Sequence, residues 1–191
     1  MAQLQSKINA KPGQQPLISI NEQVSLSDSE KQQIDAALSH VSQASGASSR
    51  TSLGGISIEA LKIVQQHRGW VSDGALNAIS DYTKIPVADL DSVATFYNLI
   101  FRKPVGKVVL HPCDGISCDL MGGKEVRNYI CRTLKIGNAQ TTDDNQFTLI
   151  PLPCLGACDK APVMIAAQKL YENLNIANVV LALNQLREQN P

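Results

Sequence analysis

Hydrophobic positions recur at helical spacing through the first half of the chain. Apolar residues three and four positions apart predict helices at about 27–41, 56–67, 73–84 and 86–97. Between the first two, residues 42–52 are small and polar and predict a flexible connector. We therefore predict a helical bundle domain over residues 26–103, preceded by a disordered tail of Gln, Ser and Asn at 1–25.

Local signals mark the ends of these helices. Ser27 and Glu30 form an S-x-x-E capping box, and Gly69 is placed to end the second helix. Ser72 or Asp73 caps the third helix, which must stop before Ile85 and Pro86. Pro86 suits the first residue of the fourth helix, on which Leu90, Val93 and Tyr97 are spaced for burial.

The pattern changes after Lys103 and Pro104. Strand-like runs at 105–111 and 147–152 flank a helical pattern at 122–134, with a turn at 141–146. Residues 162–166 and 169–172 predict a hairpin. A last helix is predicted to begin after its N-cap Asn175, and its buried residues are Ile176, Val179, Val180, Leu183 and Leu186. The order strand, helix, strand, strand, strand, helix predicts a second domain over residues 104–191, and an α+β chain overall.

Four of the five cysteines follow the first two predicted strands. Cys113 and Cys118 are spaced C-x4-C after one, and Cys154 and Cys158 are spaced C-x3-C after the other. A strand–helix–strand crossover leaves its strands parallel, so both pairs come to one edge of the sheet. Four thiolates meeting there predict a metal site, and the spacing alone leaves structural zinc and a [2Fe–2S] cluster both open.

Composition and charge exclude several classes of function. Seventeen basic residues balance seventeen acidic ones, so the basic excess that attracts nucleic acid is missing. No apolar run is long enough to cross a membrane, and the first residues lack the apolar stretch of a signal peptide. We therefore expect a cytoplasmic protein with no direct membrane span, whose cysteines serve metal chemistry rather than disulfides.

Three segments carry a resemblance to a known family. They are RGWVSDGALNAIS (68–80), VATFYNLIFRKPVGK (93–107) and CLGACDKAP (154–162), with Cys113 and Cys118 between the last two. Together they resemble the E subunit of NADH-quinone oxidoreductase, the thioredoxin-like [2Fe–2S] subunit family of respiratory complex I. The resemblance covers about residues 56–186.

The resemblance implies a fold and a division of labour. It implies a helical bundle followed by a thioredoxin-like [2Fe–2S] ferredoxin domain, with one cluster held by Cys113, Cys118, Cys154 and Cys158. The partners it implies are a flavoprotein subunit that binds FMN and NADH and a larger iron–sulfur subunit, in the peripheral arm of a membrane-associated complex. The sequence has no G-x-G-x-x-G or Walker motif, so we expect no NADH site and no catalytic residues in this chain.

Two alternatives remain beside this interpretation. The same subunit also occurs in NAD-linked hydrogenases and formate dehydrogenases, in which only the neighbouring subunits differ. The second alternative is a structural zinc-binding module without a redox role.

Other residues near the cysteines have simpler interpretations. Cys131 lies on the predicted helix at 122–134 and is expected to be a buried thiol. His111 is expected to end the first strand with a polar tip rather than to bind metal. Asp114, Asp119 and Asp159 are expected to be solvated loop carboxylates. Trp70, Phe96 and Tyr97 are core residues or anchors for a partner, and the sequence does not separate these roles.

Overall fold

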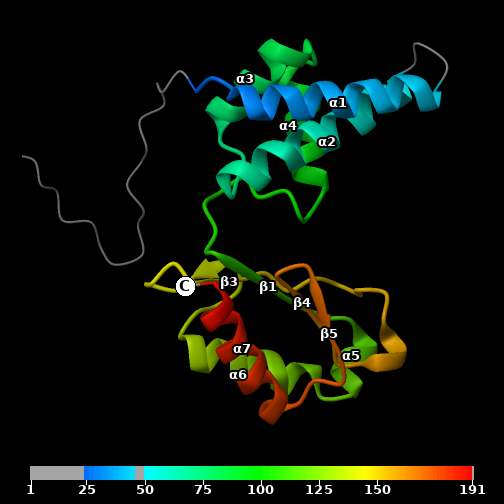
Figure 1. Cartoon of the computed structure of the whole chain (residues 1–191). Coiled ribbons are helices and arrows are strands. Elements are labelled where there is room, and N and C mark those ends of the chain that lie inside the picture. The colour runs from blue at the N-terminus through cyan, green and yellow to red at the C-terminus, as the bar shows by residue number, and fades with distance from the viewer. Residues whose placement is uncertain (1–23, 46–49, 191) are drawn as a thin grey trace, which may run out of the picture.

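The computed structural model describes residues 24–45 and 50–190. Helices gather in one half of the molecule, and a mixed sheet with further helices forms the other half (Figure 1). The buried hydrophobic residues fall into separate clusters in the two halves, one from Leu26 to Ile100 and the other from Val108 to Leu186. The predicted α+β class is confirmed. The domain limits at residues 103 and 104 stay a prediction, which the two separate cores support.

The helical half contains α1 (Asp28–Ser45), α2 (Arg50–Arg68), α3 (Asp73–Thr83) and α4 (Val87–Phe96). The flexible connector predicted at 42–52 is wrong where the structure describes it, because α1 continues to Ser45 and α2 already begins at Arg50. Residues 46–49 of that connector and residues 1–23 of the predicted tail lie outside the described residues. Small polar residues disfavour a helix only weakly, and tertiary packing overrides that preference.

Most of the predicted helix ends are confirmed. Gly69 follows α2 with φ of +81°, and the Ser72 side chain accepts a hydrogen bond from the N–H of Ala75 at the start of α3. Pro86 lies one position outside α4, as its N-cap residue. The predicted burial of Tyr97 is wrong: this side chain is 42% exposed and packs edge-on against Phe96, which is 76% exposed.

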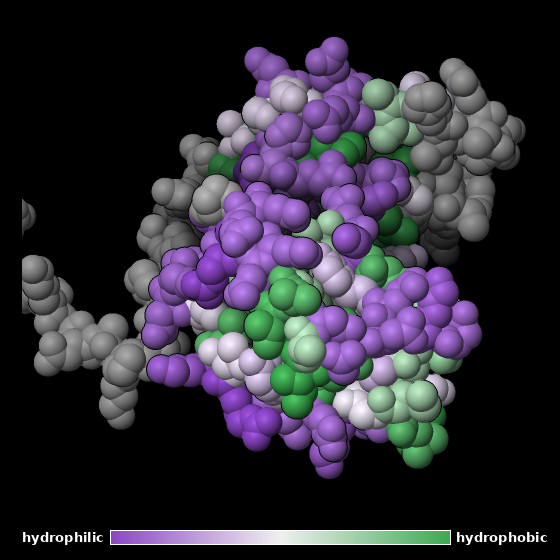
Figure 2. Space-filling model, turned by 60° about the horizontal axis from the view of Figure 1, so that its bottom comes forward, coloured by the Kyte–Doolittle hydropathy of each residue, from purple (hydrophilic) through white to green (hydrophobic). Residues whose placement is uncertain are grey.

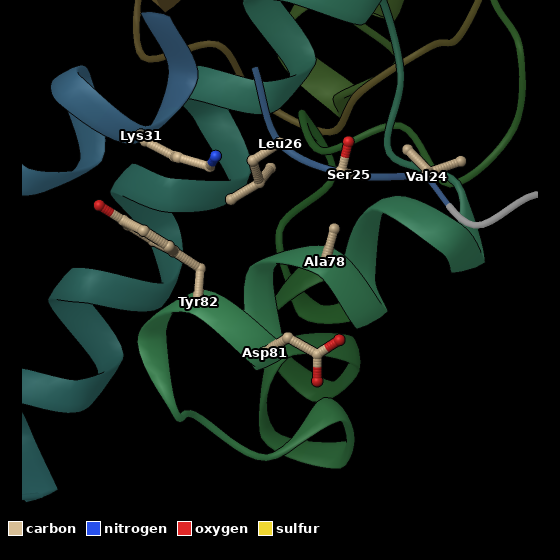
Figure 3. A pocket seen from close by; sticks show the side chains of 7 residues that line it. All are labelled: Val24, Ser25, Leu26, Lys31, Ala78, Asp81 and Tyr82. Carbon is tan, nitrogen blue, oxygen red and sulfur yellow. The ribbon is translucent and has the colours of Figure 1, made fainter. Parts of the chain in front are cut away.

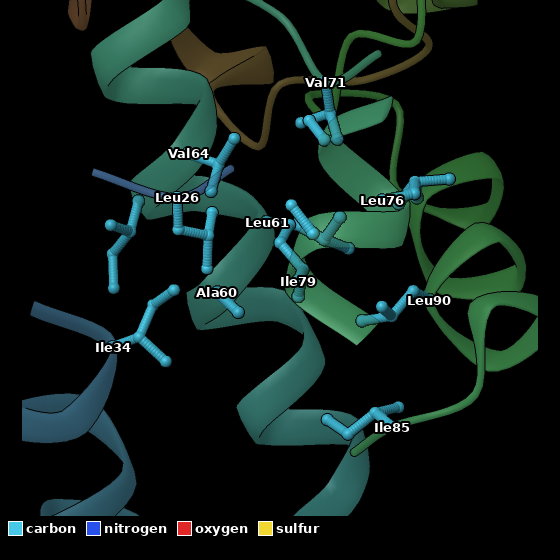
Figure 4. Close-up of a cluster of buried hydrophobic side chains, with 14 of the residues drawn as sticks. Leu26, Ile34, Ala60, Leu61, Val64, Val71, Leu76, Ile79, Ile85 and Leu90 are labelled. Carbon is cyan, nitrogen blue, oxygen red and sulfur yellow. The ribbon is translucent and has the colours of Figure 1, made fainter. Parts of the chain in front are cut away.

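Side chains from all four helices meet in the core of the helical half (Figure 4). Leu61 and Val64 of α2 are fully buried there, against Ile34 of α1 and Ile79 of α3. Such burial is the main term holding short helices together, because isolated helices of this length are marginal in water.

A buried ion pair closes one edge of this core. Glu30 is only 1% exposed, and its carboxylate accepts hydrogen bonds from Nε and Nη2 of Arg68, both at 2.6 Å. The predicted capping box is present as well, since the N–H of Ser27 donates to Glu30 Oε2 at 2.7 Å and the N–H of Glu30 donates to Ser27 Oγ at 3.2 Å. Arg68 therefore ties the end of α2 to the beginning of α1.

The sheet has the strand order β2-β3-β1-β4-β5. Its strands are β1 (Val108–Pro112), β2 (Gln140–Thr141), β3 (Phe147–Leu149), β4 (Met164–Ala166) and β5 (Lys169–Tyr171). β1 pairs parallel with β3, with Leu110 opposite Leu149, and the other pairings are antiparallel. The predicted crossover between neighbouring parallel strands is therefore confirmed.

The hairpin and the flanking helices also follow the prediction. β4 and β5 turn through Ala167 and Gln168, which both have positive φ, as a two-residue hairpin with a type I′ turn requires. α6 (Gly123–Leu134) and α7 (Ile176–Gln189) pack against each other and share the core of the sheet (Figure 1). Asn175 caps α7 as expected, whereas Ile176 is 47% exposed and its predicted burial is wrong.

Two short elements were not predicted. The helix α5 (Ile116–Leu120) begins within the C-x4-C segment and extends two residues past Cys118, and β2 ends at the first residue of the predicted turn. Five residues cannot show helical periodicity and two residues cannot show alternation, so neither element leaves a pattern in the sequence.

Candidate metal centre

The parallel pairing of β1 and β3 brings the two cysteine segments together. Beyond the regular strands, the N–H of Leu152 donates to the carbonyl of Pro112 at 3.1 Å, and the N–H of Asp114 donates to the carbonyl of Leu152 at 3.1 Å. Cys113 thus forms a parallel bridge with Leu152, two residues before Cys154. The two segments leave the sheet at the same edge, as the sequence predicted.

The first cysteine loop (113–118) and the second (154–158) contact each other at Gly115. A Cβ atom at this position would lie 3.3 Å from the backbone nitrogen of Cys154 and 3.4 Å from the sulfur of Cys113. The distance to Cys154 is tighter than most Cβ contacts, so a larger residue at position 115 would require the Cys154 backbone to shift by a few tenths of an ångström.

The four thiols differ in exposure. Cys113 and Cys118 are 3% and 1% exposed and pack with Ala161 and Val163, whereas Cys154 and Cys158 are exposed. The sulfurs of the exposed pair lie 3.7 Å apart. Two sulfurs bound tetrahedrally to one metal ion at about 2.3 Å lie about this far from each other.

Backbone groups of the second loop point at the sulfur of Cys113. Burial raises the pKa of this thiol, but hydrogen bonds from the backbone of Gly115, from the Cys118 thiol, and then from the backbone of Leu155 and Cys154 outweigh it. The pKa of Cys113 therefore lies below its ordinary value. The site is built to stabilise a thiolate here, which is the form of cysteine that binds metals.

The remaining thiols interact across the two pairs. Burial raises the pKa of Cys118, and the charges of Cys113 and Cys158 raise it further. Interaction with Cys154 raises the pKa of Cys158, and the charge of Cys113 adds to this. Negative charge on one thiol thus opposes negative charge on the others, and a bound cation would relieve this repulsion.

Among the other sequence candidates, Asp119 differs most from its prediction. Cys131 is half-buried on α6 and packs against the core of the sheet. His111 is 5% exposed and its Nδ1 donates to the carbonyl of Ile150 at 2.9 Å; burial lowers the pKa of this imidazole. Asp114 and Asp159 are exposed as predicted. Asp119 is only partly solvated: its side chain is 33% exposed, but its Oδ1 is buried 2.7 Å from Nη2 of Arg127.

Sequence reasoning missed Ser117 and Arg127 beside the cysteines, whereas Gly123 is one of the small residues of the loops that favour a close backbone approach. The side chain of Ser117 hydrogen-bonds Cys158. A Cβ atom at Gly123 would lie 2.6 Å from the carbonyl oxygen of Cys118, so α6 begins in direct contact with the first loop. Arg127, one turn further along α6, donates to the carbonyl oxygen of Cys113 at 2.7 Å. The small residue at position 123 is a weak sequence signal of a close backbone contact, whereas the sequence gives no signal that Arg127 lies beside the cysteines.

A family model decides the assignment. The model described as "Thioredoxin-like [2Fe-2S] ferredoxin" matches residues 47–187, which is most of the chain. The chain belongs to this family.

Relatives of this thioredoxin-like [2Fe–2S] ferredoxin include named proteins of several bacteria. The chain is 45% identical over 140 residues to the E subunit of NADH-quinone oxidoreductase from Pseudomonas aeruginosa, covering 73% of this chain and 79% of that one. It is 48% identical over 118 residues to the protein of the same name in Escherichia coli K12, covering 62% of this chain and 71% of the other.

A solved structure shares the fold. The crystal structure of an NAD+-reducing [NiFe]-hydrogenase in the air-oxidized state matches with a TM-score of 0.60 at 23% identity. The match covers 69% of this chain and 23% of the hydrogenase chain, so this ferredoxin is similar to one part of a longer polypeptide.

The cysteine site fits the cluster for which the family is named. A [2Fe–2S] cluster takes four cysteine thiolates, two on each iron, and this site offers two pairs of thiols on two touching loops. Within residues 24–45 and 50–190, no three His, Cys, Asp or Glu side chains are grouped to hold one metal ion. The two pairs of thiols are the donors that two irons with two cysteines each would need.

A pocket lies away from the cysteines in the described part of the ferredoxin. A cavity of about 550 Å³ lies on the helical half, and the residues that line it include Leu26, Lys31 and Tyr82 (Figure 3). None of its lining residues belongs to the half of the chain that carries the cysteines. In the part of the chain that the structure describes, no helix is both long and apolar enough to cross a membrane.

Proposed function

We propose that this ferredoxin is the electron-transfer subunit of the NADH-oxidising module of an NADH-quinone oxidoreductase. In this proposal Cys113, Cys118, Cys154 and Cys158 hold one [2Fe–2S] cluster. The observation that carries it is the contact between the two cysteine loops, in which the backbone of Gly115 lies against that of Cys154 and the N–H of Gly115 donates to the sulfur of Cys113 at 3.4 Å. The names of the relatives, at 45–48% identity, supply the parent complex.

The protein's own groups have a defined role at such a site. When bound, the cluster would supply one-electron redox chemistry. Hydrogen bonds from Gly115, Cys154 and Leu155 stabilise negative charge on the Cys113 sulfur, and such bonds tune a cluster's reduction potential. Burial of Cys113 and Cys118 keeps water from one side of the site, while exposed Cys154 and Cys158 leave the other side open to a partner.

We also propose the partners of this subunit: a flavoprotein that binds FMN and NADH, and a larger iron–sulfur subunit, in the cytoplasmic peripheral arm of the complex. Exposed apolar side chains near the cysteines support the proposal of a protein partner there. Ile116, Leu120 and Met121 of the α5 region are 75%, 80% and 64% exposed. Apolar side chains also gather in patches on the face seen in Figure 2. Exposed apolar clusters of this kind are typical of protein interfaces.

Cluster content of purified variants tests the first part. The chain is purified without oxygen, and its iron, sulfide and zinc are measured with the EPR spectrum after reduction by dithionite. We expect two irons per chain and an S = 1/2 signal in the wild type. Cys154→Ser should lose the signal, whereas Cys131→Ser should keep it, because Cys131 lies on α6 away from the loops. A wild-type protein that holds one zinc and no iron, even with iron in excess, would contradict the proposal.

Co-purification from the native source tests the second part. A tag on the chain should recover a flavoprotein that reduces the cluster when NADH is added. Recovery with nickel-containing subunits, and without a quinone-reducing activity, would instead assign the chain to an NAD-linked hydrogenase.

A further inference from the structure

Arg127 connects the two ends of the C-x4-C loop. Its Nη1 donates to the carbonyl oxygen of Cys113 at 2.7 Å, and its Nη2 lies 2.7 Å from Oδ1 of Asp119. Asp119 directly follows Cys118 in the chain. One guanidinium group therefore contacts the residue at one end of the loop and the neighbour of the residue at the other end.

The guanidinium lies in a confined place. Its side chain is 16% exposed, and that of Asp119 is 33% exposed. The Oδ1 atom of Asp119 is buried and makes no hydrogen bond to any other described group, so Arg127 is the charge that compensates it. A planar guanidinium can reach two acceptors at once, which an ammonium on a flexible chain does poorly.

The helix that carries Arg127 is itself fixed against the loop. Gly123, at the start of α6, approaches the Cys118 backbone so closely that a Cβ atom would lie 2.6 Å from its carbonyl oxygen. Arg127 follows one turn later, on a helix whose Val126 and Ile130 are buried in the core of the sheet. The position of the guanidinium is thus set by the packing of α6 against the core and against the Cys118 backbone.

We infer that Arg127 is a positioning residue of the cysteine site, which holds the Cys113–Cys118 loop closed and balances the charge of Asp119 beside it. This inference rests on the proposed [2Fe–2S] function. With four thiolates the cluster is anionic and becomes more so on reduction, so nearby positive charge favours the reduced form. Arg127 therefore acts in two ways that experiment can separate: it slows the loss of metal, and it raises the reduction potential against the opposing effect of Asp119.

The test uses the full chain with its cluster bound and four variants. Arg127→Gln removes the charge and shortens the bridge, Arg127→Lys keeps the charge but loses the planar fork, and Asp119→Asn removes the opposing charge. Arg132→Gln is the matched control, because Arg132 is exposed on the same helix. Two quantities are measured: the rate at which a chelator removes iron, and the midpoint potential from an EPR redox titration. Far-UV circular dichroism checks that each variant is folded.

The expected results differ in direction among the variants. Arg127→Gln should lose iron on the order of tenfold faster than wild type and should have a lower midpoint potential. Arg127→Lys should lose iron faster than wild type at nearly the wild-type potential. Asp119→Asn should have a higher potential, and Arg132→Gln should match wild type in both measurements.

Three results would overturn the inference in distinguishable ways. If wild type binds the cluster but Arg127→Gln keeps both the wild-type rate and the wild-type potential, the positioning role is wrong and the proposed function stands. If Arg127→Gln and Asp119→Asn shift the potential in the same direction, the charge-balancing role is wrong. A wild-type chain that binds no cluster would remove both the inference and the proposed function.

Discussion

Replacing Glu30 by Gln should destabilise the helical half strongly at neutral pH and hardly at all in acid. The substitution keeps the size of the side chain and leaves an oxygen that can still accept a hydrogen bond in the capping box. The substitution removes the negative charge of the carboxylate. In the wild type, Oε2 of this carboxylate lies 2.6 Å from Nη2 of Arg68, and the Glu30 side chain is 2% exposed.

The pKa of Glu30 gives the size of the effect. Hydrogen bonds from the Arg68 guanidinium lower this pKa from 4.5 to about 2, although burial opposes them. Since a tenfold change in a protonation equilibrium corresponds to about 1.4 kcal/mol, the charged form stabilises the fold by up to about 3 kcal/mol. The amide of Gln recovers part of this, so we expect a loss of about 1–3 kcal/mol in the free energy of unfolding at pH 7.

The direction of the pH dependence follows from the lowered pKa. A carboxyl group that binds protons less tightly in the folded state contributes its full stability above pH 4.5, and this is lost as the pH falls toward 2. Glutamine does not titrate, so the variant lacks this contribution at every pH. The difference between wild type and Glu30→Gln should therefore close between pH 4.5 and about 2.

Fluorescence of Trp70 is a suitable assay. It is the single tryptophan of the chain, it is half-buried, and it lies two residues after Arg68, so it reports on the helical half. Urea unfolding curves at a series of pH values give the difference in free energy. Glu59→Gln is the matched control, because Glu59 pairs with Lys62 at the surface and should contribute no more than about 0.5 kcal/mol. A Glu30→Gln loss that is constant across the pH series, or no larger than that of Glu59→Gln, would refute the reasoning.

Three further substitutions have expected outcomes that unfolding and metal analysis can check. Gly123→Ala should cost about 1–3 kcal/mol and reduce the iron content, because its Cβ would overlap the Cys118 carbonyl; unchanged iron and stability would contradict the contact. Gly55→Ala should instead stabilise the chain by up to about 1 kcal/mol in thermal unfolding, since it lies within α2 and a Cβ there meets nothing within 4 Å. Asn175→Ala should cost about 1 kcal/mol, because its side chain accepts a hydrogen bond from the N–H of Asn178 at the start of α7; a stability equal to wild type would show that this cap contributes nothing.

The sequence alone determined the local elements and the edge at which the cysteines meet. Helical spacing, the capping box at Ser27 and the cap at Asn175 act over a few residues, so their signals lie within the segments that they shape. The crossover rule then carried Cys113 and Cys154 to the same edge of the sheet, because parallel strands share the direction of their ends. That these cysteines bind the cluster stays a prediction, supported by the family to which the chain belongs.

Only the tertiary structure decided which distant side chains meet. Arg68 reaches Glu30 across 38 residues, and Arg127 reaches the Cys113 carbonyl across 14 residues. Nothing in the spacing of an arginine says which acceptor it will find, since that depends on how two elements pack. The predicted burial of Tyr97 is wrong for a related reason. Helical periodicity predicts which face of a helix a residue lies on, but α4 ends at Phe96, so Tyr97 lies outside the helix. Local order is encoded by neighbours in the chain, whereas the surroundings of the cysteines are set by packing between elements.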